Sequence, residues 1–144
     1  MNWRVDWVVG VPFVVLILTV HVFGLGAIAR IIARPVSADL SGAAPISLLR
    51  FGMVMGVVSL LATILYGLEA VMWAAVYWFL GALNDPASAV LYSLSAVTSY
   101  GHADLILEKR WQLLGAIEAL NGMMLFGLTT AFLFAIIQRS RVMR

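Results

Sequence analysis

The sequence predicts an all-α membrane protein with three transmembrane helices and one short re-entrant helix that is followed by a loop. Of the 144 residues, 63% are hydrophobic and only 11% are charged, and the mean hydropathy of +1.02 exceeds that of soluble domains. Three apolar stretches are each long enough to cross the hydrocarbon core of a bilayer. A shorter helical stretch lies between the second and the third.

The first transmembrane helix is expected within residues 1–33. The apolar stretch from about Trp7 to Ala29 would cross roughly 30 Å of hydrocarbon at about 1.5 Å per residue. Residues 34–50 are polar and are expected to form a cytoplasmic linker. The helix-breaking residues of this linker are Pro35, Asp39, Ser41, Gly42 and Pro45.

Residues 51–144 are expected to form one domain of three helices and a loop. Asp85 is a suitable N-cap and Pro86 a suitable first helical residue, so a short helix is expected to begin there. This helix is too short to cross a bilayer and is predicted to re-enter it from the outer face. The expected elements are an outer helix at 51–83, the short helix at 86–97, a loop at 98–104 and an inner helix at 111–138.

The basic residues predict the orientation of the helices, because positive charge favours the cytoplasmic side. The connection after the first span and the C-terminal tail fall on the same side if three helices cross, and both are basic. Their arginines are Arg30, Arg34, Arg50, Arg139, Arg141 and Arg144. The opposite side carries Arg4, Lys109 and Arg110. We therefore expect the N-terminus outside and the C-terminus inside.

The loop after the short helix consists of Thr98, Ser99, Tyr100, Gly101, His102, Ala103 and Asp104. It resembles Thr-Thr-x-Gly-Tyr-Gly-Asp, the filter sequence of the tetrameric potassium-channel superfamily. The match covers Thr98, Gly101 and Asp104, and Ser99 conservatively replaces Thr. Together with the helices on either side, this loop makes the chain similar to the two-transmembrane pore-domain family of that superfamily, with one additional N-terminal helix.

The resemblance implies both an assembly and a function. Four subunits would surround one axis in a bacterial inner membrane, with residues 51–144 as the pore domain and the short helix as its pore helix. Backbone carbonyls from Ser99 to Ala103 would form a cation selectivity filter, with Thr98 as the innermost hydroxyl and Asp104 as an anionic outer rim. The implied partners are the lipid bilayer, further copies of the chain and permeant K⁺ or Na⁺ at the filter carbonyls.

Two residues of the loop depart from the family pattern. His102 replaces a Tyr, and its imidazole is smaller and titrates near neutral pH. Ala103 replaces the second Gly and would be strained by roughly 1–2 kcal/mol in the left-handed backbone conformation that Gly101 adopts freely. The prediction is a cation channel with an atypical filter, for which weak selectivity and pH modulation are both compatible with the residues. The alternative is a channel-derived subunit that does not conduct and has an assembly or accessory role.

Other classes of function have little support in the sequence. No nucleophile, metal-ligand spacing or cofactor motif indicates an enzyme, so neither catalysis nor a cofactor is expected. The absence of cysteine excludes disulfides and thiolate metal sites, and the net charge of +2 is too small and too scattered for nucleic-acid binding. His21 and His102 lie on separate elements, so a metal or haem site is not expected.

Glu118 and Asn121 lie one turn apart on the inner helix and are candidate functional residues. A carboxylate at the centre of a bilayer has to be protonated, paired or hydrated. We expect Glu118 to brace the filter by accepting a hydrogen bond, and contact with ions in a cavity or a bond between subunits are the alternatives. The donors considered are Ser93, Ser95 and Thr98.

Glu69 and His21 lie deep within the second and the first span. Glu69 is expected to be protonated and hydrogen-bonded to a hydroxyl group, with a structural role. The hydroxyl groups considered are those of Thr63, Tyr66 and Tyr77. His21 is expected to bond to a neighbouring helix.

The inner helix also offers candidates for gating. Gly122 falls near the place of the hinge glycine in the resembled family, although close helix packing explains it equally well. Leu128 and Phe132 are candidates for a hydrophobic constriction. Residues at helical spacing that could line a cavity are Met124, Leu128, Ala131 and Ala135.

Overall fold

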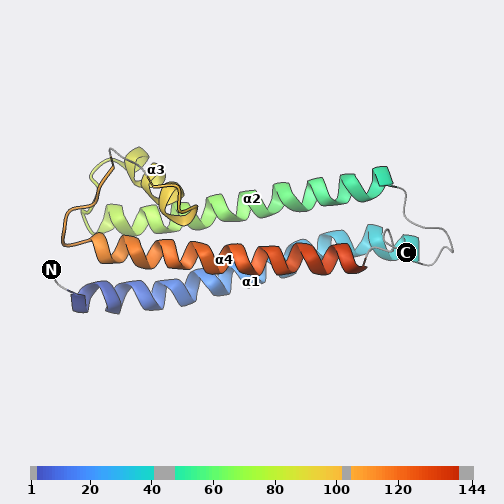
Figure 1. Ribbon diagram of the computed structural model, residues 1–144, viewed down its shortest axis with the longest axis horizontal. Coiled ribbons are helices and arrows are strands. Elements are labelled where there is room, and N and C mark those ends of the chain that lie inside the picture. Colours follow the sequence, from blue (N-terminus) through green and yellow to red (C-terminus); the bar gives the residue numbers. More distant parts are fainter. Residues whose placement is uncertain (1–2, 41–47, 102–104, 140–144) are drawn as a thin grey trace.

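The computed structural model describes residues 3–40, 48–101 and 105–139, and within them the only regular elements are helices. Three of these helices are long and one is short (Figure 1). Their bounds are Trp3–Leu40 for α1, Leu48–Phe79 for α2, Pro86–Val97 for α3 and Gln112–Arg139 for α4.

The long helices lie side by side, with α1 and α4 running in the same direction and α2 running against them (Figure 1). Helix α1 packs along both α4 and α2. The short helix α3 packs against α2 and α4 at the end of the bundle where α2 ends and α4 begins. The chain therefore enters α1 at one end of the bundle and leaves α4 at the other.

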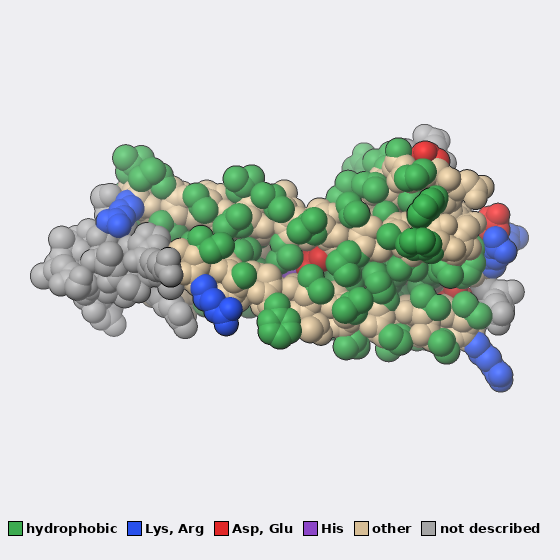
Figure 2. Space-filling view, turned by 180° about the vertical axis from the view of Figure 1, so that it is seen from behind, with side chains coloured by type: hydrophobic (Ala, Val, Ile, Leu, Met, Phe, Trp, Pro, Cys, Tyr) green, Lys and Arg blue, Asp and Glu red, His purple; other side chains and the backbone are tan. Residues whose placement is uncertain are grey.

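Three helical segments are long and apolar enough to cross a membrane, which confirms the predicted number of spans. They are Arg4–Ile32, Leu48–Phe79 and Gln112–Gln138. Hydrophobic side chains cover the visible face of the bundle, and the Lys and Arg side chains lie toward its two ends (Figure 2). This distribution suits a protein whose middle lies in hydrocarbon and whose ends lie in water.

The interior of the bundle contains two clusters of buried apolar side chains. One lies near α3 and includes Ile17, Trp73 and Leu114. The other lies toward the far end and joins α1 to α2 through residues such as Leu25 and Val58. Close packing of this kind holds helices together in lipid, where apolar surface by itself favours neither association nor dissociation.

The first helix is longer than the sequence indicated. We expected a linker from residue 34, but α1 continues through Pro35 and ends at Leu40. A proline removes one backbone hydrogen bond and so weakens a helix, but a helix with favourable flanking residues can continue past it. At its other end the expected linker is also too long, because residues 48–50 already belong to α2, and the part at residues 41–47 lies outside the described residues.

Helix α2 ends at Phe79, before the boundary expected at residue 83, and the reason lies in Gly81. This glycine has a φ of +65°, the left-handed conformation that ends many helices. The N–H of Ala82 donates to the carbonyl of Tyr77 at 2.9 Å, and that of Gly81 donates to the carbonyl of Trp78 at 3.1 Å. This pair of bonds is a Schellman motif. Gly81 is a common helix stop signal, but in the sequence it lies inside a long apolar run that indicates a continuing helix.

Helix α3 begins as predicted, with Asp85 as N-cap and Pro86 in the first turn. The backbone N–H and the hydroxyl of Ser88 donate to Asp85 Oδ2 at 2.8 and 2.7 Å. These bonds stabilise the carboxylate and hold the pKa of Asp85 below its ordinary value. The cap fixes the point at which the chain turns from α2 into α3.

Candidate functional site

Two glycines of α4 allow α3 to lie directly against it. A Cβ atom at Gly122 would occupy the position of the Val97 carbonyl, and one at Gly115 would occupy that of the Tyr92 hydroxyl. Tyr92 is thus level with the beginning of α4, and Val97, the last residue of α3, lies further along it. Helix α3 therefore runs beside α4 in the same general direction.

This packing places the end of α3 well along the third candidate span. Gly122 is ten residues after Gln112, where α4 begins, which corresponds to about 15 Å at about 1.5 Å per residue. The hydrocarbon core of a bilayer is roughly 30 Å thick. If α4 crosses that core, the carbonyl end of α3 lies near its middle.

The backbone after α3 turns sharply. Thr98 caps the helix, and its hydroxyl donates to the carbonyl of Leu94 at 2.6 Å. Ser99 and Gly101 have φ values of +56° and +68°, so left-handed residues alternate with Tyr100 between them. Gly101 thus has the left-handed backbone that the sequence led us to expect, whereas the left-handed Ser99 was not foreseen.

The described part of the loop lies open on the surface of the single chain. Thr98, Ser99, Tyr100 and Gly101 are all exposed, and the side chain of Tyr100 is 82% exposed. The N–H of Gly101 donates to the carbonyl of Ser95 at 3.2 Å, which holds the loop against the end of α3. The other predicted filter residues, His102, Ala103 and Asp104, lie outside the described residues.

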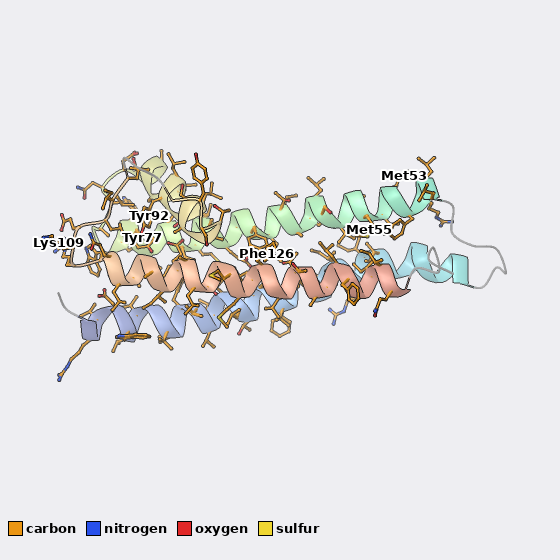
Figure 3. All side chains as sticks on the ribbon, in the orientation of Figure 1. Met53, Met55, Tyr77, Tyr92, Lys109 and Phe126 are labelled. Carbon is orange, nitrogen blue, oxygen red and sulfur yellow. The ribbon has the colours of Figure 1, made fainter. Side chains whose placement is uncertain are left out.

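Behind this loop, a buried hydrogen bond connects α2 to α4. The hydroxyl of Tyr77 donates to Glu118 Oε2 at 2.6 Å, and neither side chain is exposed. Tyr92 of α3 packs edge-on against Tyr77, with ring centroids 5.2 Å apart. Figure 3 shows Tyr77 and Tyr92 together at the end of the bundle that carries α3. Glu118 therefore ties together the helices around the loop.

The short hydrogen bond to Glu118 comes from Tyr77, which was not one of the three donors considered from the sequence. The hydroxyls of Ser95 and Thr98 donate to backbone carbonyls of α3 instead. The third, Ser93, is fully buried and its hydroxyl interacts with Glu118, but without the geometry of a close hydrogen bond. Within the described residues, Glu118 Oε1 and both amide atoms of Asn121 also lack a close hydrogen bond. Buried polar groups normally bond to protein or to water, so this cluster has unused bonding capacity.

A second buried polar cluster joins all three long helices. His21 of α1 lies with Nδ1 2.9 Å from Glu69 Oε1 of α2 and with Nε2 2.9 Å from Thr129 Oγ1 of α4. His21 and Glu69 are completely buried, and Thr129 is 9% exposed. The ring of Tyr66 lies edge-on to His21 at 5.5 Å between centroids.

The prediction that His21 bonds to a neighbouring helix is confirmed, but the predicted partners of Glu69 are wrong. The hydroxyl of Thr63 donates to a carbonyl of its own helix, and that of Tyr77 donates to Glu118. Glu69 bonds to His21, because two antiparallel helices bring residues distant in sequence to the same level.

Some residues of these clusters, and one buried carboxylate outside them, were missed from the sequence as site residues. Tyr77 was considered only as a partner of Glu69, and Thr129 was not considered. Asp6, in the first turn of α1, is 1% exposed, and neither of its carboxylate oxygens bonds to another described residue. For Asp6 the available signal was a lone carboxylate at the beginning of an apolar helix.

The remaining inner-helix candidates lie on different faces of α4. Met124, Leu128, Ala131 and Ala135 are all exposed on the single chain, so they share an open face. Phe132 instead packs partly buried against the cluster that joins α1 to α2. Of the two constriction candidates, Leu128 is therefore the one on the open face.

Comparisons with protein-family models, with curated proteins and with solved structures give no match for this chain. The function is therefore inferred from the geometry of the site. Within the described residues, no group of three or more His, Asp or Glu side chains is placed to hold a metal ion. The site consists of a helix end that lies about 15 Å along α4, an exposed loop with two left-handed residues, and two buried polar clusters.

Proposed function

We propose that this chain is the subunit of a tetrameric cation channel with an atypical selectivity filter in the loop 98–104. The observation that carries the proposal is the contact between Val97 and Gly122. It puts the end of α3, and the non-helical backbone after it, about 15 Å along a helix that is long enough to span a bilayer. In the proposed channel α3 is the re-entrant pore helix.

The position of the loop supports an assembly of several copies. Irregular backbone within hydrocarbon is tolerated only where protein covers it or water reaches it. In a single chain the described part of this loop is exposed. Neighbouring copies around a central aqueous pore would supply both the cover and the water.

The electrostatics of the site favour a cation. The carbonyl end of a helix carries about half a negative charge, and α3 ends at the loop. Two left-handed residues that flank one residue outside the left-handed region, as Ser99 and Gly101 flank Tyr100, can turn successive carbonyls toward one side. Carbonyl oxygens arranged in this way replace the hydration shell of an ion such as K⁺ or Na⁺.

The open face of α4 completes the proposed pore. Met124 and Leu128 lie beyond the level of the loop and are exposed in the single chain. In the tetramer this face lines the lower cavity, and Leu128 is placed for a hydrophobic constriction. The C-terminal end of α4 then faces the cytoplasm, as the distribution of arginines favours.

Cation flux into liposomes tests the proposal. Protein shown to be tetrameric by native mass spectrometry is reconstituted, and K⁺ and Na⁺ uptake are measured at pH 5.5 and 7.5. We expect the wild type to take up cations and Gly101→Ala to lose most of this uptake, because alanine is strained at a φ of +68°.

Gly81→Ala is the matched control. Gly81 has a φ of +65° and open space around it, as Gly101 has, so alanine introduces a comparable strain away from the loop. We expect Gly81→Ala to retain uptake. A folded tetramer that passes neither cation at either pH would contradict the proposal and favour the non-conducting subunit.

A further inference from the structure

The buried cluster around His21 has no part in the proposed channel function. Both nitrogens of a completely buried imidazole are engaged, one by a carboxylate and one by a hydroxyl, and the three groups come from three different helices. An ionisable group inside a membrane bundle is costly, and its position usually reflects a role.

Which group donates each hydrogen bond of His21 depends on how many protons the imidazole ring carries. With His21 neutral and its proton on Nδ1, the ring donates to Glu69 Oε1 and accepts the hydroxyl proton of Thr129 at Nε2. With one more proton on Nε2, the ring donates to both neighbours. The hydroxyl of Thr129 must then turn its own proton elsewhere. The carbonyl four residues earlier in α4, that of Leu125, is the usual acceptor for a helical threonine.

The added proton also changes the charge of the cluster. When Glu69 is ionised and His21 is neutral, the cluster carries one net negative charge inside the bundle. Protonation of His21 gives an ion pair with no net charge. An uncompensated charge is costly in a low dielectric, so the added proton and the carboxylate of Glu69 compensate each other.

We propose that His21, Glu69 and Thr129 form a proton-binding site inside the membrane bundle, whose occupancy sets the contact between α1 and α4. One proton binds to Nε2 of His21, and the bond between His21 and Thr129 reverses its direction. The hydroxyl of Thr129 then bonds within α4, a bond that often bends a helix. The site is independent of the proposed filter.

Few other groups face the imidazole. From α2 it meets Glu69 and the ring of Tyr66, whose buried hydroxyl interacts with Thr129. From α4 it meets Thr129, which does not titrate. Along α1 the nearest charged residues are Asp6 and Arg30, each at least about two turns away. Glu69 is therefore the partner that controls the proton on His21.

Nitrogen-15 NMR of the imidazole in liposomes tests the site directly. The chain has two histidines, so His102→Asn leaves the signals of His21 alone. Between pH 4 and pH 9 we expect a change from the doubly protonated ring to the neutral ring with its proton on Nδ1. A ring that keeps one protonation form throughout this range in folded protein would overturn the proposal.

Two variants in the same background separate the roles of the partners. Glu69→Gln removes the charge that faces the imidazolium, so we expect about tenfold less of the doubly protonated ring, relative to the neutral ring, at a given pH. Thr129→Val removes the hydroxyl that bonds to Nε2 and should shift the Nε2 signal of the neutral ring, while the proton stays on Nδ1 beside Glu69. Thr19→Val is the matched control, because the hydroxyl of Thr19 is exposed and bonds only within α1. Unchanged spectra in both Glu69→Gln and Thr129→Val would contradict the proposal.

The movement of α1 against α4 needs a separate readout. The chain contains no cysteine, so spin labels can be placed uniquely on the exposed positions Phe23 and Phe126 after Phe23→Cys and Phe126→Cys. We expect the distance between the labels to change by about 1–2 Å between low and high pH. Thr129→Val should remove this change, and Thr129→Ser should restore it. A distance that is independent of pH while His21 titrates would overturn the coupling between helices.

Discussion

The contact between α3 and α4 can be tested by adding one methyl group. Gly122→Ala places a Cβ atom where the Val97 carbonyl lies. The obstruction is backbone, so no change of side-chain rotamer relieves it. The end of α3 must move away from α4 by roughly an ångström to restore ordinary packing distances.

The size of the effect follows from two opposed contributions. Overpacking a closely packed interface costs about 1–3 kcal/mol. Replacing glycine by alanine inside a helix returns about 1 kcal/mol. We therefore expect Gly122→Ala to lower the free energy of unfolding by up to about 2 kcal/mol.

Gly127→Ala provides the comparison, since it is the same substitution in the same helix at a position with nothing within 4 Å of the new Cβ atom. It should be neutral or stabilising. The measurement is reversible unfolding of both variants in mixed detergent micelles, followed by circular dichroism. If Gly122→Ala proves as stable as Gly127→Ala, the end of α3 does not lie against α4, and the depth assigned to the loop is wrong.

Two further predictions concern the bond behind the loop and the start of α3. Tyr77→Phe leaves Glu118 without its donor and should lower the free energy of unfolding by about 1–3 kcal/mol, whereas Tyr100→Phe, at an exposed position, should leave it unchanged in the same unfolding assay. The lowered pKa of Asp85 means that its cap stabilises the protein above the ordinary carboxyl range and that this contribution disappears as the pH falls through the folded-state pKa. Thermal unfolding from pH 7 to pH 2 should therefore show a difference between wild type and Asp85→Ala that vanishes in acid, and a constant difference would contradict it.

The spans were predictable because length and hydropathy decide whether a segment can cross a bilayer. The short helix was predictable for a local reason, since Asp85 and Pro86 satisfy the needs of a helix start by themselves. The ends of α1 and α2 were less predictable. Pro35 did not end α1, and the stop signal of Gly81 lay within an apolar run that looked continuous.

The polar clusters could be anticipated only in part. A buried histidine or glutamate predicts that some partner exists, but the choice of partner depends on how the helices align. Counted from the observed helix starts, Trp3 and Gln112, His21 and Thr129 lie at nearly equal depth, about 27 and 26 Å along parallel helices. The starts expected from the sequence, about Trp7 and residue 111, give about 21 and 27 Å and do not bring the two residues together. Such a count does not place Glu69 beside His21 either. Helix α2 runs against α1 (Figure 1), and the turn at Gly81 shifts the level of its residues relative to those of α1.

The buried polar bonds give the bundle its register. Apolar packing holds the helices together, but directional hydrogen bonds distinguish more sharply between one register and the next. A slide of α1 by one residue, about 1.5 Å, would break both bonds of His21 at once. Likewise, the bond between Tyr77 and Glu118 joins α2 to α4 beside α3, where Gly122 fixes the depth of the loop. The bond between Tyr77 and Glu118 and the contact at Gly122 therefore hold the end of α3, and with it the loop, at one level of α4.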